Sequence, residues 1–236
     1  MSPKRRVAVM SGVFAVLGVG VSVAIIAANG GFSADGPNII DPPTADDIWV
    51  VGSNIQDGTM LEYSLDAKGP SSELRSSTVS LDFMDAGNSW NVTFNIANGT
   101  AGSVEKTIVM SKELTREGEL DAEFGAYFEP IQESLLAVRD MEYGSSPKYL
   151  VIGAPWNVIF VGATSATVRV TAEERIETGA GAFDSFVLTY KLNDNTSRIW
   201  MVDSMPLPVK AEAFDADDQL QYRFELLRAS GVESGS

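Results

Sequence analysis

Carboxylates are the only abundant side chains in this sequence that could act as catalytic acids, bases or metal ligands. The 236 residues include 32 Asp and Glu and 17 Lys and Arg, with neither His nor Cys. Their absence excludes Ser-His-Asp and Cys-His catalysis, thiolate or imidazole metal sites and disulfide bonds. Any catalysis would depend on carboxylates, Lys, Tyr or Ser, as in a glycosidase with two carboxylates across a cleft.

The most conspicuous carboxylates occur as adjacent pairs, which is typical of a solvated surface. In a strand the two members of such a pair point to opposite faces, so they do not face each other across a cleft. The acidic run 215–218 could offer oxygen ligands to Ca²⁺, but it lacks the Gly and the distal Glu of a calcium loop. We therefore predict no catalytic residue, no metal ligand and no cofactor, with a carboxylate-dependent hydrolase as the less favoured alternative. The pairs are Asp46/Asp47, Glu173/Glu174 and Asp217/Asp218.

Aromatic side chains are the remaining candidates for a ligand site. They could line an apolar pocket inside a curved sheet, with Tyr hydroxyls at its mouth as polar anchors. The alternative is that these residues are ordinary core. The candidates are Tyr63, Trp156, Tyr190, Trp200 and Tyr222.

Three Asn-x-Ser/Thr triplets are candidate sites of N-glycosylation in an exported protein. They begin at Asn91, Asn98 and Asn195. Asn98 and Asn195 fall in apparent turns, which favours them, whereas Asn91 lies in an expected strand.

The N-terminal residues predict a membrane anchor. Residues 1–6 form a cationic tip with Lys4, Arg5 and Arg6, and residues 7–28 are 22 uncharged, mostly apolar residues. As a helix this stretch would be roughly 33 Å long, enough to cross a hydrocarbon core of roughly 30 Å. The preceding cations favour an N-terminus in the cytoplasm and the remaining chain outside. The alternative is a cleaved secretory signal, since Ser22-Val23-Ala24 has the small-x-small pattern of a cleavage site.

Beyond the anchor, composition divides the chain into a spacer, a domain and a tail. Residues 29–46 contain three Gly and three Pro, which indicates a linker. Residues 47–228 are predicted to form one extracytoplasmic domain, and residues 229–236 a disordered tail. The net charge of −15 argues against a nucleic-acid partner, because binding phosphate backbones requires positive surface.

Two-residue alternation dominates the domain and predicts short antiparallel strands. The pattern Leu61-x-Tyr63-x-Leu65 recurs at 188–192 and, with Phe as its last member, at 220–224. This recurrence fits either two related halves or the general appearance of amphipathic strands. One helix is expected over about 130–142, with Pro130 in its first position and an apolar stripe from Ile131 to Val138. The predicted fold is mainly β, an antiparallel curved sheet or open barrel packed on this helix.

The C-terminal part, residues 175–228, resembles bacterial periplasmic lipoprotein-carrier relatives in the order of its strands. The series is Gly181-Ala-Phe-Asp-Ser-Phe-Val-Leu-Thr-Tyr-Lys-Leu, Arg198-Ile-Trp-Met-Val-Asp, Met205-Pro-Leu-Pro-Val-Lys-Ala-Glu and Leu220-Gln-Tyr-Arg-Phe-Glu-Leu. In that family a Trp-bearing strand precedes a Pro-containing strand, and an incompletely closed barrel wraps one or more helices. The resemblance implies an apolar cradle that can receive acyl chains. The anchor, acidity and sequons are also similar to uncharacterised envelope proteins of ammonia-oxidising archaea.

We therefore expect a single-pass membrane protein of the cell envelope that binds or scaffolds without catalysis. Its expected partners are the bilayer through residues 7–28 and either another envelope or membrane protein or a lipid-like ligand. The alternative is a structural component of the cell surface that binds no ligand.

Overall fold

The computed structural model describes residues 42–69, 73–98, 102–142, 147–161 and 164–232. The predicted cytoplasmic tip, the anchor at 7–28, residues 29–41 of the spacer and residues 233–236 lie outside these ranges. No helix within the described residues is both long and apolar enough to cross a membrane.

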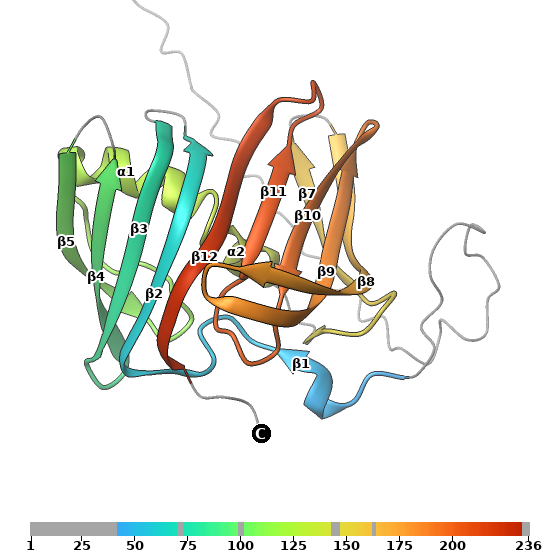
Figure 1. Cartoon of the computed structure of the whole chain (residues 1–236), viewed down its shortest axis with the longest axis horizontal. Helices are drawn as coiled ribbons and strands as arrows, with labels where there is room; N and C mark the ends of the chain where they lie inside the picture. Colours follow the sequence, from blue (N-terminus) through green and yellow to red (C-terminus); the bar gives the residue numbers. More distant parts are fainter. Residues whose placement is uncertain (1–41, 70–72, 99–101, 143–146, 162–163, 233–236) are drawn as a thin grey trace, which may run out of the picture. The chain divides into compact units, whose positions relative to one another are not determined.

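Ten antiparallel strands form one continuous sheet (Figure 1). Their order in the sheet is β5-β4-β3-β2-β12-β11-β10-β9-β8-β7, so two runs of sequential strands are joined where β2 pairs with β12. β5 and β7 form its two edges, and the sheet is not closed into a barrel. The strands are β2 (Ile55–Lys68), β3 (Glu73–Asp85), β4 (Ser89–Asn98), β5 (Gly102–Ser111), β7 (Pro155–Val161), β8 (Thr164–Thr178), β9 (Gly181–Leu192), β10 (Asn195–Met201), β11 (Lys210–Phe214) and β12 (Leu220–Val232).

A short sheet and a 3-10 helix lie beside the ten strands. The 3-10 helix η2 spans Ala45–Asp47, and β1 (Ile48–Trp49) pairs with β6 (Lys148–Tyr149). β12 continues to Val232, so the strand extends four residues into the segment that the sequence assigned to a disordered tail.

Alternation along the strands gives the sheet one apolar and one polar face. Buried and partly exposed residues alternate from Thr59 to Lys68 in β2 and from Trp90 to Ile96 in β4. We call the apolar side the inner face and the opposite side the outer face. The recurring Leu-x-Tyr-x-Leu/Phe segments lie in β2, β9 and β12, where all three tyrosines are buried.

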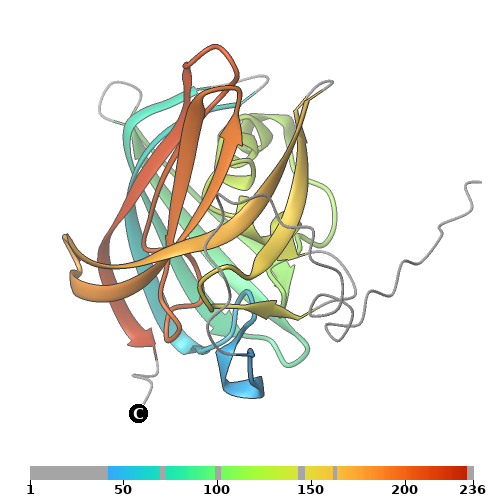
Figure 2. The same cartoon turned by 90° about the vertical axis from the view of Figure 1, so that its right-hand side faces the viewer.

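Two helices cover the concave inner face, rather than the single helix expected at 130–142 (Figure 2). They are α1 (Ala122–Gln132) and α2 (Ala137–Glu142), separated by turns at 133–136. α1 begins early because the Asp121 carboxylate caps it, accepting the Phe124 N–H at 2.8 Å. Pro130 therefore lies inside the helix, near its end, where the prediction had placed the first turn.

The packing of α1 explains the extra helical turns. Phe124 and Phe128 lie edge-on to Phe94 of β4, with ring centroids 6.2 and 5.5 Å apart. All three side chains are at most 2% exposed. The apolar stripe that the sequence assigned from Ile131 onward thus begins seven residues earlier, at Phe124.

Candidate functional site

The best-defined concave site lies on the outer face, where β2 pairs with β12. Cross-strand pairing places Arg198, Glu212, Arg223 and Asp66 in one row across β10, β11, β12 and β2. Directly opposed residues in antiparallel strands share a face, so charges of alternating sign are neighbours along this row. We call these four residues the charge row.

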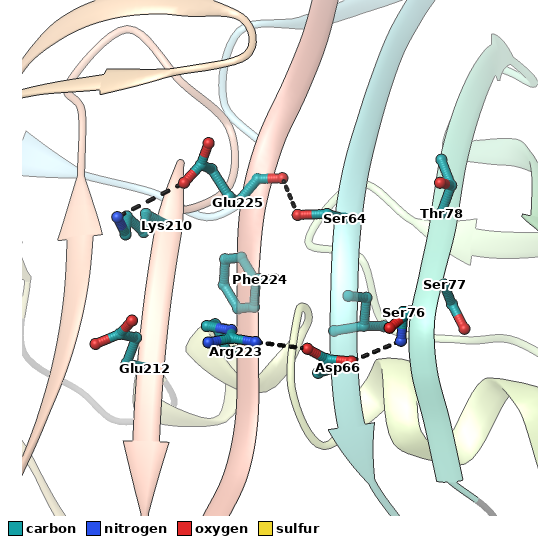
Figure 3. A pocket seen from close by; sticks show the side chains of 11 residues that line it. Ser64, Asp66, Ser76, Ser77, Thr78, Lys210, Glu212, Arg223, Phe224 and Glu225 are labelled. Atoms are coloured by element: carbon teal, nitrogen blue, oxygen red, sulfur yellow. Dashed lines mark hydrogen bonds and ion pairs between the residues drawn. The ribbon is translucent and has the colours of Figure 1, made fainter. Parts of the chain in front are cut away.

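A groove of about 560 Å³ follows part of this row, and we call it the outer groove (Figure 3). Leu65 and Phe224 contribute to it only from below, because their side chains are buried on the inner face. The other lining residues are polar or charged: Ser64, Asp66, Ser76, Ser77, Thr78, Lys210, Glu212, Arg223 and Glu225.

Asp66 is the most firmly held charge in the outer groove. A β-bulge shifts the register between β2 and β3 at this point, and Ser76 adopts a φ of 48° there. The Ser76 N–H donates to Asp66 Oδ1 at 2.6 Å, and Arg223 Nη2 donates to Oδ2 at 2.9 Å. The Ser76 hydrogen bond is the largest cause, and Arg223 a smaller one, that lowers the pKa of Asp66. Asp66 is therefore a fixed anion at neutral pH.

Lys210 forms the opposite wall of the groove. Its Nζ lies 3.6 Å from Glu225 Oε2 and 5.5 Å from the ring centroid of Trp200. The Ser64 hydroxyl donates to the Glu225 backbone carbonyl at 3.4 Å, which ties β2 to β12 beside this pair. The groove thus carries two ordered pairs of opposite charge, Asp66–Arg223 and Glu225–Lys210.

The β8–β9 hairpin crosses the outer face of β12 beside the groove (Figure 1). The Ala180 N–H donates to the Leu226 carbonyl at 3.2 Å, and a Cβ on Gly179 would lie 3.0 Å from the Leu227 Cα. Glycine is therefore needed where the hairpin tip meets β12. The hairpin covers Trp200, whose Nε1 donates to Glu174 Oε2 at 3.0 Å and which is 5% exposed.

The five aromatic candidates do not form one pocket, and none lines the outer groove. Trp200 lies on the outer face under the hairpin. Trp156 packs against Trp49, with centroids 5.6 Å apart, and its Nε1 donates to the Tyr149 carbonyl. Only Tyr63, Tyr190 and Tyr222 come together.

Two of these tyrosines contact Phe224 on the inner face, and the third contacts Tyr222. Tyr63 lies edge-on to the Phe224 ring at 5.8 Å, and Tyr222 is stacked on it at 6.1 Å. Tyr190 is hydrogen-bonded to Tyr222 and Ser197 through its side chain. Burial raises the pKa of all three hydroxyls. Among the described residues, the Tyr63 hydroxyl is buried without a hydrogen-bond partner.

Asp47 of the first acidic pair and Asp215, beside the third, accept hydrogen bonds from the backbone of a cap and a turn, whereas Glu174 of the second pair accepts one from the Trp200 side chain. Asp47 accepts the Thr44 N–H and hydroxyl at 2.7 and 2.8 Å, with the backbone bond the larger cause that lowers the pKa of Asp47. In the 215–218 run, Asp215 Oδ1 accepts the N–H groups of Asp217 and Gln219, both at 2.9 Å. In the described part of the chain, no group of three or more acidic residues is arranged to hold a metal ion.

The candidate glycosylation sites occupy three different settings. Asn91 lies within β4, and Asn98 is the last residue of that strand, with the rest of its triplet outside the described residues. Asn195 begins β10, and its Nδ2 donates to the backbone carbonyls of Asp215 and Ala216 at 3.2 and 3.5 Å. Glycosylation at each site stays a prediction.

No family model matches the chain, and no curated protein matches it. Three solved structures are similar in part. A protein assigned as a lipoprotein of Parabacteroides distasonis is 16% identical, with a TM-score of 0.39 over 77% of this chain and 99% of the other. A protein of Bacteroides fragilis assigned as exported, with a YmcC-like fold, is 12% identical, with a TM-score of 0.31 over 78% and 99%. MucB is 12% identical, with a TM-score of 0.41 over 79% of this chain and 57% of its own. These scores identify neither a family nor a function, and the similarity to archaeal envelope proteins stays a prediction.

The sequence does not single out the outer groove, because its residues come from four separate segments, two near residues 64–78 and two near residues 210–225. Asp66, Lys210 and Arg223 each occupy an ordinary polar position of an alternating strand. Their proximity depends on the pairing of the first long strand with the last, which no local pattern encodes. The only local signal in the sequence is that each of the segments 210–212 and 223–225 carries a cation and, two residues later, an anion.

Proposed function

We propose that this protein is a membrane-anchored, extracytoplasmic binding protein without catalytic activity. In this proposal the outer groove holds a polar, charged segment of another envelope or membrane protein. The observation that carries it is the pair of fixed, opposite charges on each side of the groove, Asp66–Arg223 and Lys210–Glu225. Charges that are already ordered select a complementary segment with little ordering cost on binding.

The charges of the groove favour binding over catalysis. The lowered pKa of Asp66 makes it a poor proton donor at neutral pH, since a general acid needs a pKa near the working pH. Each of the two pairs also places a carboxylate next to a cation of its own. A partner segment with both a cation and an anion could form ion pairs with the groove residues in place of the existing ones. No charge would then be left unpaired.

The location in the proposal comes from the sequence. The uncharged residues 7–28 would contact the bilayer, and Lys4, Arg5 and Arg6 would keep the N-terminus in the cytoplasm. Secretion after cleavage of this segment is the alternative. A net charge of −15 supports a protein partner over nucleic acid.

A lipid-like ligand on the inner face is the second candidate, and Tyr63 is the observation that favours it. Its hydroxyl is buried among apolar side chains without a hydrogen-bond partner, so a ligand with a polar group could satisfy it. An acyl chain would have to displace α1 from Phe94, because those side chains fill the space in this conformation. A structural surface component without a ligand is the third candidate, and a carboxylate-dependent hydrolase is the least favoured.

Native mass spectrometry of the full chain, extracted in detergent, separates these candidates. A co-purifying protein subunit supports the proposal, a co-purifying lipid supports the second candidate, and a bare chain contradicts both. A photo-activatable residue at Thr78 in the groove should cross-link the partner, whereas one at Thr107, on the same face outside the groove, should not.

A matched pair of variants tests the groove itself. Asp66→Asn removes the charge while its Oδ1 can still accept the Ser76 N–H, so the bulge is retained. We expect it to lower the Thr78 cross-link yield at least fivefold. Asp82→Asn changes the same residue type on the outer face of β3, outside the groove, and should leave the yield unchanged. Equal yields for both variants would exclude the groove as the binding site.

A further inference from the structure

The outer face of the β3–β4–β5 region carries an isolated apolar strip. The described residues leave four large apolar side chains exposed, and two of them, Met84 and Val109, are 63% and 38% exposed. Met84 of β3 and Val109 of β5 are both directly opposite Asn91 of β4, one on each side. Directly opposed residues have Cβ atoms about 5 Å apart, so the two apolar side chains flank the Asn91 amide.

Asn91 is also the first residue of an Asn-Val-Thr triplet whose polar members share this face. Residues two apart in a strand point the same way, so Thr93 lies beside Asn91 on the outer face. The Thr93 hydroxyl forms a hydrogen bond of 2.8 Å with that of Thr107. Within the described part of the chain, the Asn91 amide makes no hydrogen bond, so its Nδ2 is available.

Asn195 differs in each of these respects. Its Nδ2 donates to the carbonyls of Asp215 and Ala216, which fixes the turn between β11 and β12. The Ser197 hydroxyl of its triplet is fully buried and accepts the Phe214 N–H at 3.0 Å. A sugar on Asn195 would compete with these contacts.

We propose that Asn91 is an N-glycosylation site of this domain and that the attached sugar covers Met84 and Val109. The donor would be a polyprenyl-phosphate-linked oligosaccharide. The Asn91 Nδ2 forms a bond to the anomeric carbon, and the bond from that carbon to the phosphate oxygen breaks. The polyprenyl phosphate leaves with the electron pair of that bond, and the proton lost from Nδ2 passes to a base of the transferase or to solvent. No oxidant or reductant is involved. The apolar face of the first sugar ring then packs on the flanking side chains, which removes an exposed apolar strip from water.

This assignment reverses the order suggested by the sequence, which favours Asn98 and Asn195 over Asn91 because both fall in apparent turns. The proposal rests on the export of the domain, as the proposed function does, but not on the outer groove. Digestion of intact host cells with an external protease tests export separately. If the protease removes the domain, the domain is exported. The absence of a glycan would then contradict only the assignment of Asn91.

Intact-mass measurement of the protein purified from its own host tests the site. We expect Asn91→Gln to lower the mass by one complete glycan beyond the substitution itself, whereas Asn195→Gln changes only the residue mass. Thr93→Val should remove the same glycan as Asn91→Gln, and Thr93→Ser should retain it because the triplet is preserved. Identical glycan content in the wild type and Asn91→Gln would overturn the proposal.

A second measurement tests the covering of the apolar strip. Asn91→Gln should increase retention on a hydrophobic column, because it exposes Met84 and Val109. In a background that carries Met84→Ser and Val109→Thr, the same substitution should increase retention by less than half as much. Equal increases in both backgrounds would show that the glycan does not cover these side chains.

Discussion

On β2 and β12, the inner face carries buried apolar side chains, whereas the outer face carries charged side chains that form ion pairs. Leu65 and Phe224 point inward and are 2% exposed, whereas the adjacent Asp66 and Arg223 point outward and form an ion pair. On the inner face burial raises the pKa of hydroxyls, and on the outer face hydrogen bonds lower the pKa of a carboxylate. The same backbone thus holds a packed core and a charged groove, so the core fixes the spacing of the groove residues.

We therefore expect substitutions on the inner face to disturb both the core and the outer groove, whereas substitutions on the outer face disturb the outer face alone.

Phe94→Ala should cost about 3–5 kcal/mol of unfolding free energy, because it removes a buried ring that contacts Phe124 and Phe128 and leaves a cavity. Thr107→Ala, on the outer face of the adjacent strand β5, should cost less than about 1 kcal/mol, since it removes one exposed hydrogen bond, to Thr93. Urea unfolding of both variants measures the difference. Similar losses would mean that the two faces do not differ in their contribution to stability.

Alkaline pH should destabilise the domain through the inner face. Tyr63, Tyr190 and Tyr222 have raised pKa values in the folded state, whereas an unfolded Tyr titrates near about 10. Their contribution to stability is complete below about pH 10 and is lost as the pH rises towards the folded values. If all three tyrosines keep their protons in the folded state, the unfolding free energy falls by up to about 4 kcal/mol per pH unit, which is about 1.4 kcal/mol for each Tyr.

Urea midpoints between pH 9 and 11.5 measure this slope. Tyr190→Phe should reduce it by about a third, since one titrating hydroxyl is removed. A slope that does not change in this variant would mean that Tyr190 titrates equally in both states.

Tyr63→Phe should stabilise the domain by about 1 kcal/mol, which is the opposite sign to the usual effect of a core substitution. The Tyr63 hydroxyl is buried without a partner, so its removal relieves an uncompensated desolvation cost while the ring contact with Phe224 is kept. Thermal unfolding measures the change. A loss of stability would indicate that an ordered water or a bound ligand satisfies this hydroxyl.

Local patterns predicted the strands better than they predicted the helix or the site. Alternation around Tyr63, Tyr190 and Tyr222 identified β2, β9 and β12, because burial on one face imposes a two-residue period. The sequence predicts the start of the helix too late, because the Asp121 cap depends on one side chain, whereas the apolar stripe after Pro130 is conspicuous.

The candidate site was not predictable for a different reason. The outer groove depends on which strands pair, and a polar residue such as Arg223 has the same local appearance whether it faces Asp66 or solvent. The aromatic candidates were chosen by residue type alone, and the structure distributes them between both faces.

Asp66→Asn should have the smallest effect on stability, about 0.5 kcal/mol at neutral pH, because it removes the charge and the Oδ2 acceptor of a partly exposed ion pair with Arg223. Since the folded pKa of Asp66 is lowered, its ionised form stabilises the domain above the unfolded pKa near about 3.9, and this contribution is lost as the pH falls through the folded value. The wild type and Asp66→Asn should therefore converge in stability in strong acid.

Asp66→Ala, which also leaves the Ser76 N–H without its acceptor, should remain less stable than Asp66→Asn at every pH. Chemical unfolding of the three proteins at pH 7 and in strong acid separates the charge of Asp66 from its role in the bulge, and a difference between wild type and Asp66→Asn that persists in strong acid would contradict the lowered pKa.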